Sequence, residues 1–365
     1  MRLTIINRMP KTFKALVTKE KKVPASLDSL SIDDLPKASS IKQMSKTVTG
    51  ECDTIVKVSY STLNYKDAMV VTGKYPGLKY PMIGGIDLVG DVVQTTNASL
   101  KEGDTVVMNS FGVGTDHFGG YSELASLRSD WLLPLKSIGS GLESKDAARI
   151  GTAGLTAMLM VNTITEVGGL SGPIKPSDGP IGVTGSTGGV GSVAVSLLSS
   201  LGYDVIAVTG KVEKESEYLK KLGATTILCR SEFEIEAKPL GKETFAGCVD
   251  TVGGNVLSNM LSKMQYNGCV AACGMAGGMG IPGASVAPFI LRGVSLFGVD
   301  CVFQNLDVRE NVYKKYIPHL LQNRMLDIIG GEQTVGLKEV PSLGDKMLKG
   351  QTSGRYVVDI SKDLD

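Results

Sequence analysis

Residues Gly185-Ser186-Thr187-Gly188-Gly189-Val190-Gly191 form the stretch of sequence that decides the fold. The stretch follows a short apolar run at 180–184 and leads directly into an apolar helical pattern at 193–198. A strand, a glycine turn and a helix in that order make a pyrophosphate cradle, because glycine permits the tight turn and the helix start offers free N–H groups. A glycine string alone also fits an ordinary loop, but a second apolar run at 204–209 follows at the spacing of a Rossmann unit. The pattern therefore predicts a dinucleotide site, contacted by Gly185, Ser186, Thr187, Gly188, Gly189 and Val190.

The end of the second apolar run predicts which dinucleotide binds. A site for NAD places an Asp or Glu there, which accepts from the ribose hydroxyls and would repel a 2′-phosphate. Here the end reads Thr209-Gly210-Lys211, and the first acid is Glu213. This end favours NADPH over NADH, unless Lys211 is simply a solvated loop lysine.

The composition limits the class of protein. A chain of 365 residues with 42% hydrophobic and 21% charged residues can bury two ordinary cores. A net charge of +1 and 5% aromatic residues give no reason to expect a nucleic acid or a membrane as partner. The first eleven residues contain neither a signal-type apolar core nor a membrane span, so we expect a cytoplasmic protein. A short organelle-targeting role for Arg2 and Arg8 stays open.

Cysteine and histidine usage argues against a metal centre. Six cysteines are scattered along the chain, and four lie in apolar strand-like runs, as is typical of free thiols in a reducing compartment. Cys269 and Cys273 alternate onto one face of a predicted strand, without the turn that a CxxC metal knuckle needs. His117 and His319 are the only histidines, and His117 has no carboxylate partner in view that would favour a catalytic role. We therefore expect catalysis without a protein-bound metal.

Apolar strand candidates alternate with helix candidates from residue 181 onward, which predicts a doubly wound parallel sheet of six strands. The predicted strands are 181–184, 205–209, 226–229, 248–251, 269–273 and 294–299, and the predicted helices are 190–201, 213–222 and 256–264. Upstream, glycine turns separate short β-like runs, which indicates a mainly β domain. The strand-like run at 355–360 is expected to return to that domain, because a six-stranded Rossmann sheet needs no further strand. The predicted domains are 150–300 for the cofactor and 1–149 with 301–365 for the substrate.

Several motifs resemble the zinc-independent branch of the medium-chain dehydrogenase/reductase superfamily, and within it the YhdH/AcuI-type NADPH-dependent acryloyl-CoA reductases. The resemblance runs from about Phe13 to the carboxyl end. The motifs that carry it are Ser61-Thr62-Leu63-Asn64-Tyr65-Lys66-Asp67, Pro81-Met82-Ile83-Gly84-Gly85-Ile86-Asp87, Gly119-Gly120-Tyr121-Ser122-Glu123, Gly151-Thr152-Ala153-Gly154-Leu155-Thr156-Ala157, Asp250-Thr251-Val252-Gly253 and Pro288-Phe289-Ile290-Leu291-Arg292. It implies a GroES-like substrate domain, a Rossmann domain and reduction of the carbon–carbon double bond of a short 2-enoyl-CoA. Acryloyl-CoA is the expected substrate.

The resemblance also implies roles for particular residues. Thr251, Val252, Gly274, Met275 and Ala276 would border the nicotinamide. Tyr75 matches the position of a proton-donating tyrosine in related enoyl-thioester reductases, and Tyr65 is the alternative proton donor. For each of the two tyrosines, a purely packing role fits the sequence equally well. Asn64 and Asp67 would orient the loop and the nicotinamide ribose. Lys79 and Arg292, with Lys314 and Lys315, are candidate contacts for the CoA phosphates, although each also fits a solvated charge.

Two further questions concern assembly and competing functions. The strand predicted at 294–299 would form an edge of the cofactor sheet, and in the resembling superfamily two such edges join across a two-fold axis. We therefore expect a homodimer or a dimer-based oligomer.

The same cofactor domain also serves reductases of quinones and of α,β-unsaturated aldehydes and ketones, which is the second functional hypothesis. A non-catalytic nucleotide-binding homologue is the third.

Overall fold

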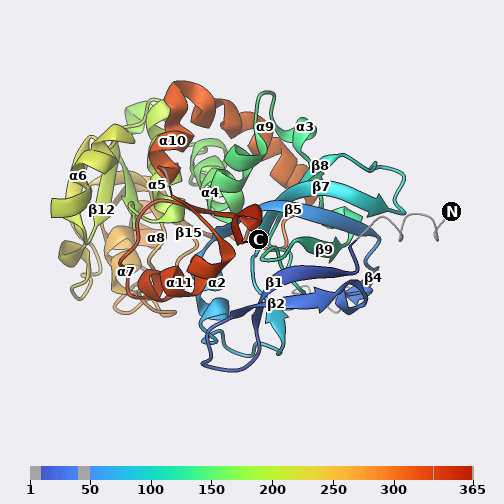
Figure 1. Ribbon diagram of the computed structural model, residues 1–365. Coiled ribbons are helices and arrows are strands. Elements are labelled where there is room, and N and C mark those ends of the chain that lie inside the picture. Colours follow the sequence, from blue (N-terminus) through green and yellow to red (C-terminus); the bar gives the residue numbers. More distant parts are fainter. Residues whose placement is uncertain (1–9, 40–49, 332, 364–365) are drawn as a thin grey trace. The chain divides into compact units, whose positions relative to one another are not determined.

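The computed structural model describes residues 10–39, 50–331 and 333–363, and it divides the chain into two compact units (Figure 1). The stretch holding Arg2 and Arg8 lies outside the described residues. The first unit comprises Met1–Thr152, Val302–Lys314 and Glu332–Asp365, and the second comprises Ala153–Cys301 and Lys315–Gly331. Lys315–Gly331 thus belongs to the second unit, whereas the prediction from the sequence placed the whole of 301–365 in the substrate domain.

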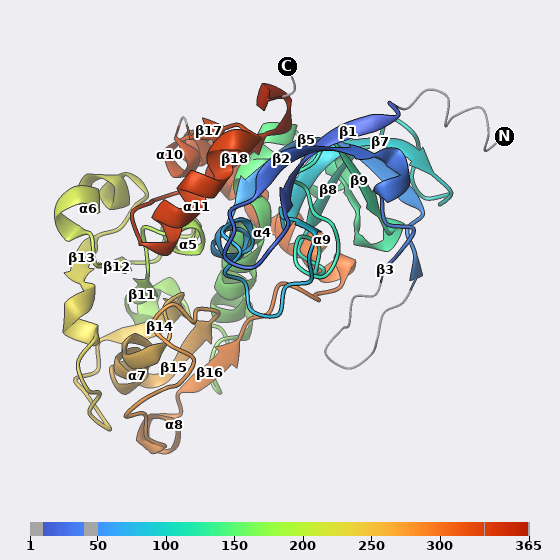
Figure 2. The ribbon, with the colours of Figure 1, turned by 60° about the horizontal axis from the view of Figure 1, so that its bottom comes forward.

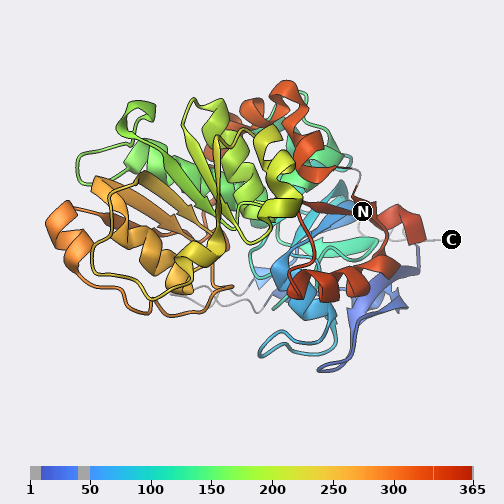
Figure 3. The same cartoon turned by 90° about the vertical axis from the view of Figure 1, so that its left-hand side faces the viewer.

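The second unit contains a parallel sheet of six strands in the order β13-β12-β11-β14-β15-β16. Figure 3 shows this sheet with helices packed on it. Every neighbouring pair in it is parallel. This order is that of a Rossmann fold, in which the order of strands across the sheet reverses between β11 and β14, so the predicted doubly wound sheet is confirmed. The strands are β11 (Ile181–Thr184), β12 (Val205–Thr209), β13 (Thr226–Cys229), β14 (Phe245–Asp250), β15 (Met264–Ala272) and β16 (Ser295–Gly298).

Helices connect these strands and bury apolar faces against the sheet. In α5, the first crossover helix, the residues from Gly191 to Leu198 are all buried, as expected for a helix that packs directly on strands. The amphipathic α6 ends before Gly223, whose φ of +101° is the left-handed conformation that glycine favours at a helix end. The helices and turns of this unit are α5 (Gly189–Ser200), α6 (Val212–Lys221), α7 (Gly254–Ser262), α8 (Ala287–Arg292), α10 (Met325–Gly330), η3 (Thr163–Val167), η4 (Pro176–Asp178), η5 (Arg230–Phe233) and η6 (Gln322–Arg324).

Two long helices cross the boundary between the units in sequence. α4 (Ser144–Asn162) starts in the first unit and is interrupted at Gly151, where φ is +51° and ψ is −166°. α9 (Leu306–Leu321) passes the boundary after Lys314. In the described part of the chain, only the helical stretch Ser144–Val167 is long and apolar enough to span a membrane, and 72% of its apolar window is buried within the fold. That burial identifies it as a packing helix.

The first unit is mainly β (Figure 2). Its buried apolar side chains form a core of their own. Its largest sheet runs β10-β8-β7-β5-β18-β17, and β9 also pairs with β5. β18 pairs antiparallel with β5, so the final strand returns to this unit as the sequence predicted. The strands are β1 (Thr12–Thr18), β2 (Ser26–Ser31), β3 (Ala38–Ser39), β4 (Gly50–Glu51), β5 (Thr54–Leu63), β6 (Met82–Ile83), β7 (Asp87–Thr95), β8 (Thr105–Asn109), β9 (Leu124–Leu127), β10 (Leu133–Pro134), β17 (Thr334–Val335) and β18 (Tyr356–Asp359).

Short helices close the connections of the first unit. The most important for the site is α2, whose residues Ala68 and Val71 join the core while its first turn begins at Asn64. The helices and turns are α2 (Tyr65–Val71), α3 (Leu135–Ile138), α11 (Val340–Leu348), η1 (Ile32–Asp34), η2 (Ser129–Trp131), η7 (Leu337–Glu339) and η8 (Ile360–Asp363).

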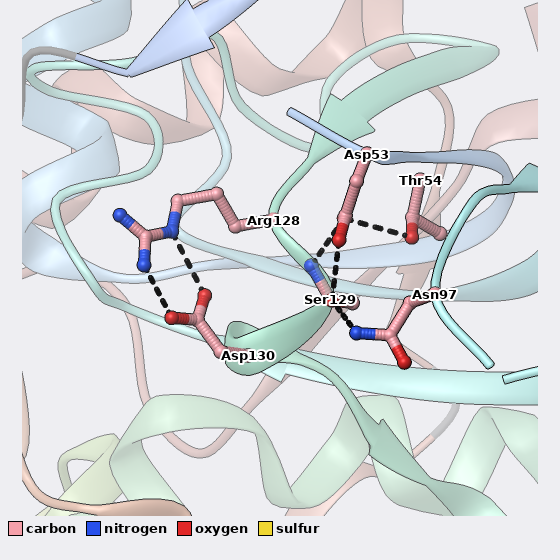
Figure 4. A network of polar contacts seen from close by, with 6 residues as sticks. All are labelled: Asp53, Thr54, Asn97, Arg128, Ser129 and Asp130. Atoms are coloured by element: carbon pink, nitrogen blue, oxygen red, sulfur yellow. Dashed lines mark hydrogen bonds and ion pairs between the residues drawn. The ribbon is translucent and has the colours of Figure 1, made fainter. Parts of the chain in front are cut away.

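A polar cluster joins three loops at one end of this sheet (Figure 4). The carboxylate of Asp53 accepts the backbone N–H and the hydroxyl of Ser129, each at 2.7 Å, and Asn97 donates its amide to the same hydroxyl at 2.6 Å. Arg128 forms a two-pronged ion pair with Asp130 beside it. These contacts satisfy loop groups that the strands leave unpaired, so we assign the cluster to the stability of the unit.

Candidate active site

The glycine stretch forms a cradle at the carboxyl end of β11. Gly185 has a φ of +58°, which turns the chain out of the strand, and the N–H of Gly188 donates to its carbonyl at 2.9 Å. Ser186 and Thr187 are buried, whereas Gly188, Gly189 and Val190 are partly exposed at the start of α5. The first N–H groups of a helix have no acceptor within it and carry the positive end of its dipole. This end of α5 can therefore receive a diphosphate.

The close packing of α5 against this turn depends on Gly191. A methyl group at Gly191 would press on the carbonyl oxygen of Gly185 and lie 2.7 Å from the Cα of Ser186. No real carbon tolerates such contacts without displacement of the backbone. Glycine at this position therefore lets the helix start directly beside the strand end.

A buried network ties the ends of β11 and β14 together. Asp250 accepts the hydroxyl of Thr184 at 2.7 Å and the N–H of Gly253 at 2.8 Å, and burial raises the pKa of its carboxyl. The hydroxyl of Thr251 donates to the carbonyl of Thr184 at 2.8 Å. The side chain of Thr251 therefore supports the turn at Gly185. A methyl group on Gly185 would collide with the hydroxyl oxygen of Thr251.

The turn after β15 packs on the turn after β14. The N–H of Gly277 donates to the carbonyl of Val252 at 2.7 Å, and a Cβ at Gly274 would collide with the backbone of Thr251. Met275 is 66% exposed beside them. The residues predicted to border the nicotinamide therefore lie together, at the carboxyl ends of the two adjacent parallel strands β14 and β15, where open sheets bind ligands.

Two cations stand at the ends of β12 and β13. Lys211 directly follows Thr209 and Gly210, and the guanidinium of Arg230 lies 3.3 Å from the position of a Cβ on Gly210. Burial is the main cause that lowers the pKa of Lys211, and the neighbouring Arg230 adds to it. Arg230 also pairs with Glu234 at 2.7 Å. Arg230 was not among the residues predicted from the sequence, although the register of Thr209 with Cys229 places the residues that follow them side by side.

In the first unit, Asn64 and Asp67 sit at the start of α2. Each oxygen of the Asp67 carboxylate accepts two N–H groups: one takes those of Gly85 and Ile86, at 3.1 and 2.8 Å, and the other takes the backbone and side-chain N–H groups of Asn64, both at 3.0 Å. Burial, with the nearby charge of Asp87, raises the pKa of Asp67 to about 7. The carboxylate thus holds the loop before β7 against the first turn of α2.

Asp87 accepts hydrogen bonds from several elements at once. Its Oδ1 accepts the N–H and the hydroxyl of Thr152, at 2.8 and 2.5 Å, and the amide of Asn109 at 2.8 Å. Its Oδ2 accepts the amide of Asn64 at 2.8 Å and the hydroxyl of Thr62. Asp87 therefore joins β5, β8 and α4 around the Asn64 amide, a role the sequence did not reveal.

The cation of this network is Arg355, which immediately precedes β18. Its guanidinium donates Nη1 to Oδ1 of Asn64 at 2.8 Å and Nε to the carbonyl of Arg149 at 2.9 Å. Nη2 is buried and has no hydrogen-bond partner among the described residues. The side chain is 2% exposed, so the guanidinium balances the buried carboxylates of Asp67 and Asp87.

The two tyrosine candidates have different surroundings. Tyr65 is the first residue of α2 and is 50% exposed. Tyr75 is half-buried and packs against a small apolar cluster of Val70, Leu78 and Met82. The apolar cluster packs against the Tyr75 ring, whereas Tyr65 directly follows Asn64 in the first turn of α2.

Arg292, one of the predicted phosphate contacts, has a guanidinium that is bound within the fold. Its guanidinium donates to the carbonyls of Gly241, Ser262 and Met264 at 2.7 to 3.1 Å, so its hydrogen-bonding groups serve the fold. Lys79 is exposed. Lys314 forms an ion pair with Glu310, and Lys315 forms one with Glu166. Neither ion pair by itself indicates a phosphate site.

His117 is buried and its Nε2 donates to the carbonyl of Ser126 at 2.8 Å, and burial lowers its pKa. It also meets the edge of the Trp131 ring. These contacts give His117 a packing role. Among the described residues, no group of three or more His, Cys, Asp or Glu side chains is placed to hold a metal ion.

Comparison with known families agrees with this arrangement. The model of the alcohol dehydrogenase GroES-like domain matches residues 50–137, and that of the zinc-binding dehydrogenases matches residues 189–321. These two matches correspond to the mainly β unit and to the unit with the parallel sheet.

Three similar proteins cover nearly the whole chain. The acrylyl-CoA reductase AcuI of Ruegeria pomeroyi is 44% identical over 324 residues, which is 88% of this chain and 94% of AcuI. The YhdH oxidoreductase of Salmonella enterica, solved in complex with NADP, has a TM-score of 0.85 at 40% identity and covers 95% of this chain and 100% of its own. YhfP of Bacillus subtilis, a putative quinone oxidoreductase, is 40% identical over 92% of this chain and 94% of its own length. Its structure with NAD bound has a TM-score of 0.84 and covers 96% of this chain and 100% of its own. The chain therefore belongs to the medium-chain dehydrogenase/reductase family, in the branch of the YhdH/AcuI-type oxidoreductases.

Proposed function

We propose that this oxidoreductase uses NADPH to reduce the carbon–carbon double bond of a short 2-enoyl-CoA, with acryloyl-CoA giving propanoyl-CoA. The observation that carries the cofactor assignment is the pair of cations, Lys211 and Arg230, beside Gly210 at the end of β12. The substrate assignment is supported by the 44% identity with an acrylyl-CoA reductase over 88% of the chain.

The residues of the second unit fit this cofactor. The start of α5 offers N–H groups for the diphosphate, and Gly191 and Gly185 leave room where any side chain would collide. Lys211 and Arg230 would pair with the 2′-phosphate, a dianion that satisfies two neighbouring cations at once. The turns at Val252 and at Gly274 would border the nicotinamide.

When bound, NADPH supplies a hydride to the β-carbon of the substrate, and negative charge then collects on the thioester oxygen. The protein must align the two reactants, stabilise that oxygen and deliver a proton to the α-carbon. Tyr65 and Tyr75 are the phenols that we assign as alternatives for the proton. Asn64 and Asp67 act as supports of the loop, because their polar atoms are bonded within the first unit.

A substrate panel tests the proposed function. Oxidation of NADPH is followed at equal concentrations of acryloyl-CoA, crotonoyl-CoA, acrolein and a quinone. We expect acryloyl-CoA to have the highest kcat/KM. The second candidate, a quinone or unsaturated-carbonyl reductase, is favoured by the similarity to YhfP. If acryloyl-CoA is at least about tenfold poorer than acrolein or the quinone, the second candidate replaces the first, since that ratio corresponds to about 1.4 kcal/mol of transition-state binding.

The proposal extends to assembly and location. β16 ends the parallel sheet on one side, and in the segment that precedes it in the chain Val286, Ile290 and Leu291 are each more than 60% exposed. An unpaired edge strand and exposed apolar side chains both favour association with a second copy, which makes a homodimer. Light scattering at micromolar concentration should give twice the monomer mass, and a monomer mass would contradict the dimer.

The six free cysteines among the described residues fit a reducing compartment such as the cytoplasm.

A further inference from the structure

The amide of Asn64 is fully engaged, and only one orientation of it suits its neighbours. Oδ1 accepts from Arg355, whereas Nδ2 faces the carboxylate oxygens of Asp67 and Asp87 at 3.0 and 2.8 Å. If the amide were flipped, its NH2 would meet the guanidinium and its oxygen would meet two carboxylates. Each contact would then be repulsive. The cation of Arg355 therefore selects the orientation of this side chain.

Asn64 in turn defines the beginning of α2. Its carbonyl accepts the first helical N–H, that of Ala68, at 2.9 Å, and its own N–H donates to Asp67 at 3.0 Å. Tyr65 is the next residue and projects from the first turn, half exposed. A movement of Asn64 would therefore shift Tyr65 directly.

We propose that Arg355 is a positioning residue, which orients the Asn64 amide and thereby holds the first turn of α2 and the phenol of Tyr65 in the geometry needed for reduction. The inference rests on the proposed function, because it makes Tyr65 part of the reacting site. This positioning role requires the planar guanidinium of Arg355, because one group must donate both to Asn64 and to the carbonyl of Arg149.

Arg355→Lys tests this role because it keeps the charge and loses the planar fork. We expect kcat to fall by roughly tenfold to a hundredfold, as small misplacements of reacting groups do. The Kd for NADPH, measured by nicotinamide fluorescence, should change by less than about twofold, because the cradle lies on the other unit. Arg309→Lys is the matched control: Arg309 is 1% exposed, lies in the same unit and donates to three carbonyls, but it contacts neither Asn64 nor Asp67.

The ionisation of Asp67 supplies a readout that does not depend on turnover. The charged and titratable groups that face Asp67 are Asp87 on β7, Arg355 before β18 and Tyr121 before β9. Removal of the cation by Arg355→Met leaves two buried carboxylates without compensation, so the pKa of Asp67 should rise above its value of about 7. Carboxyl ¹³C chemical shifts across a pH titration should show an increase of about one unit or more.

Three results would overturn the inference. The first is that Arg355→Lys loses no more kcat per folded molecule than Arg309→Lys. The second is that Arg355→Met leaves the pKa of Asp67 unchanged. A loss of NADPH affinity equal to the loss of kcat would instead make Arg355 a cofactor ligand. Failure of the proposed function is separate, because it appears as absent acryloyl-CoA reduction by the wild-type enzyme, while the titration of Asp67 can still be measured.

Discussion

The carboxyl end of the parallel sheet is built from backbone, whereas the Asn64 network of the first unit is built from side chains. At the sheet, Gly185, Gly191 and Gly274 each occupy a position where a Cβ would collide with neighbouring backbone or with Thr251. In the network, by contrast, Asn64, Asp67, Asp87 and Arg355 satisfy one another through charge and hydrogen bonds. A backbone site loses function through excess volume, and a side-chain site through a missing partner. The two regions should therefore respond to different kinds of substitution.

The largest effect is expected at the cradle. Gly191→Ala introduces a methyl group that meets the backbone of Gly185 and Ser186, which must separate the strand end from α5. We expect the Kd for NADPH to weaken by about a hundredfold or more, because the close backbone approach to the diphosphate is lost. Fluorescence titration with NADPH measures this change.

Gly280→Ala is the matched control for that substitution. A Cβ on Gly280 would have no atom within 4 Å, so its variant should bind NADPH as the wild type does. Equal Kd values for Gly191→Ala and the wild type would show that the cradle is not shaped by backbone contact, and the contrast between the two regions would then be lost.

The second effect concerns the proposed proton donor, Tyr65, which directly follows Asn64 in the chain. Tyr65→Phe removes only a hydroxyl from the first turn of α2, and we expect kcat to fall by roughly a hundredfold while NADPH binding persists. We expect a smaller loss for Tyr75→Phe, because Tyr75 packs in an apolar cluster at a distance in sequence from the Asn64 turn. Steady-state turnover with acryloyl-CoA compares the two variants.

The opposite order would assign the proton to Tyr75. Each tyrosine is removed from the mechanism if its Phe variant keeps more than about a third of wild-type turnover, since a positioned acid contributes far more than that. If both variants keep it, solvent protonates the substrate and the network serves the fold alone.

The same contrast explains what the sequence could predict. Backbone sites are encoded locally: the glycine spacing at 185–191 predicted both β11 and the start of α5. The network combines residues from Asn64 to Arg355, 291 positions apart, and nothing local to either residue indicates that they meet. The contacts of Arg292 were not foreseen for a related reason: its carbonyl acceptors lie in the loop at Gly241, at the end of α7 and at the start of β15, and only the tertiary fold brings them together. Arg230 was missed although strand register alone would have placed it beside Gly210.

A third, smaller effect separates charge from shape at the end of β12. Lys211→Ala and Arg230→Ala should each weaken NADPH by about 1–2 kcal/mol, roughly tenfold in Kd, as expected for partly exposed charge-assisted contacts. NADH, which lacks the 2′-phosphate, should bind nearly as before. Isothermal titration with both cofactors measures the difference. An equal loss for NADPH and NADH would mean that these cations support the strand ends instead of reading the phosphate.

The smallest effect distinguishes an exposed cation from one that the fold uses. Lys79 is exposed, so Lys79→Ala leaves the fold unchanged, and if it contacts a CoA phosphate the KM for acryloyl-CoA should rise by about three- to tenfold. Arg292→Lys keeps a positive charge but cannot serve the carbonyls of Gly241, Ser262 and Met264 together, so it should lower the melting temperature and leave that KM within about twofold. Thermal melting and steady-state kinetics of both variants provide the comparison. A raised KM without loss of stability in Arg292→Lys would return Arg292 to the substrate site, because a purely structural arginine affects stability first.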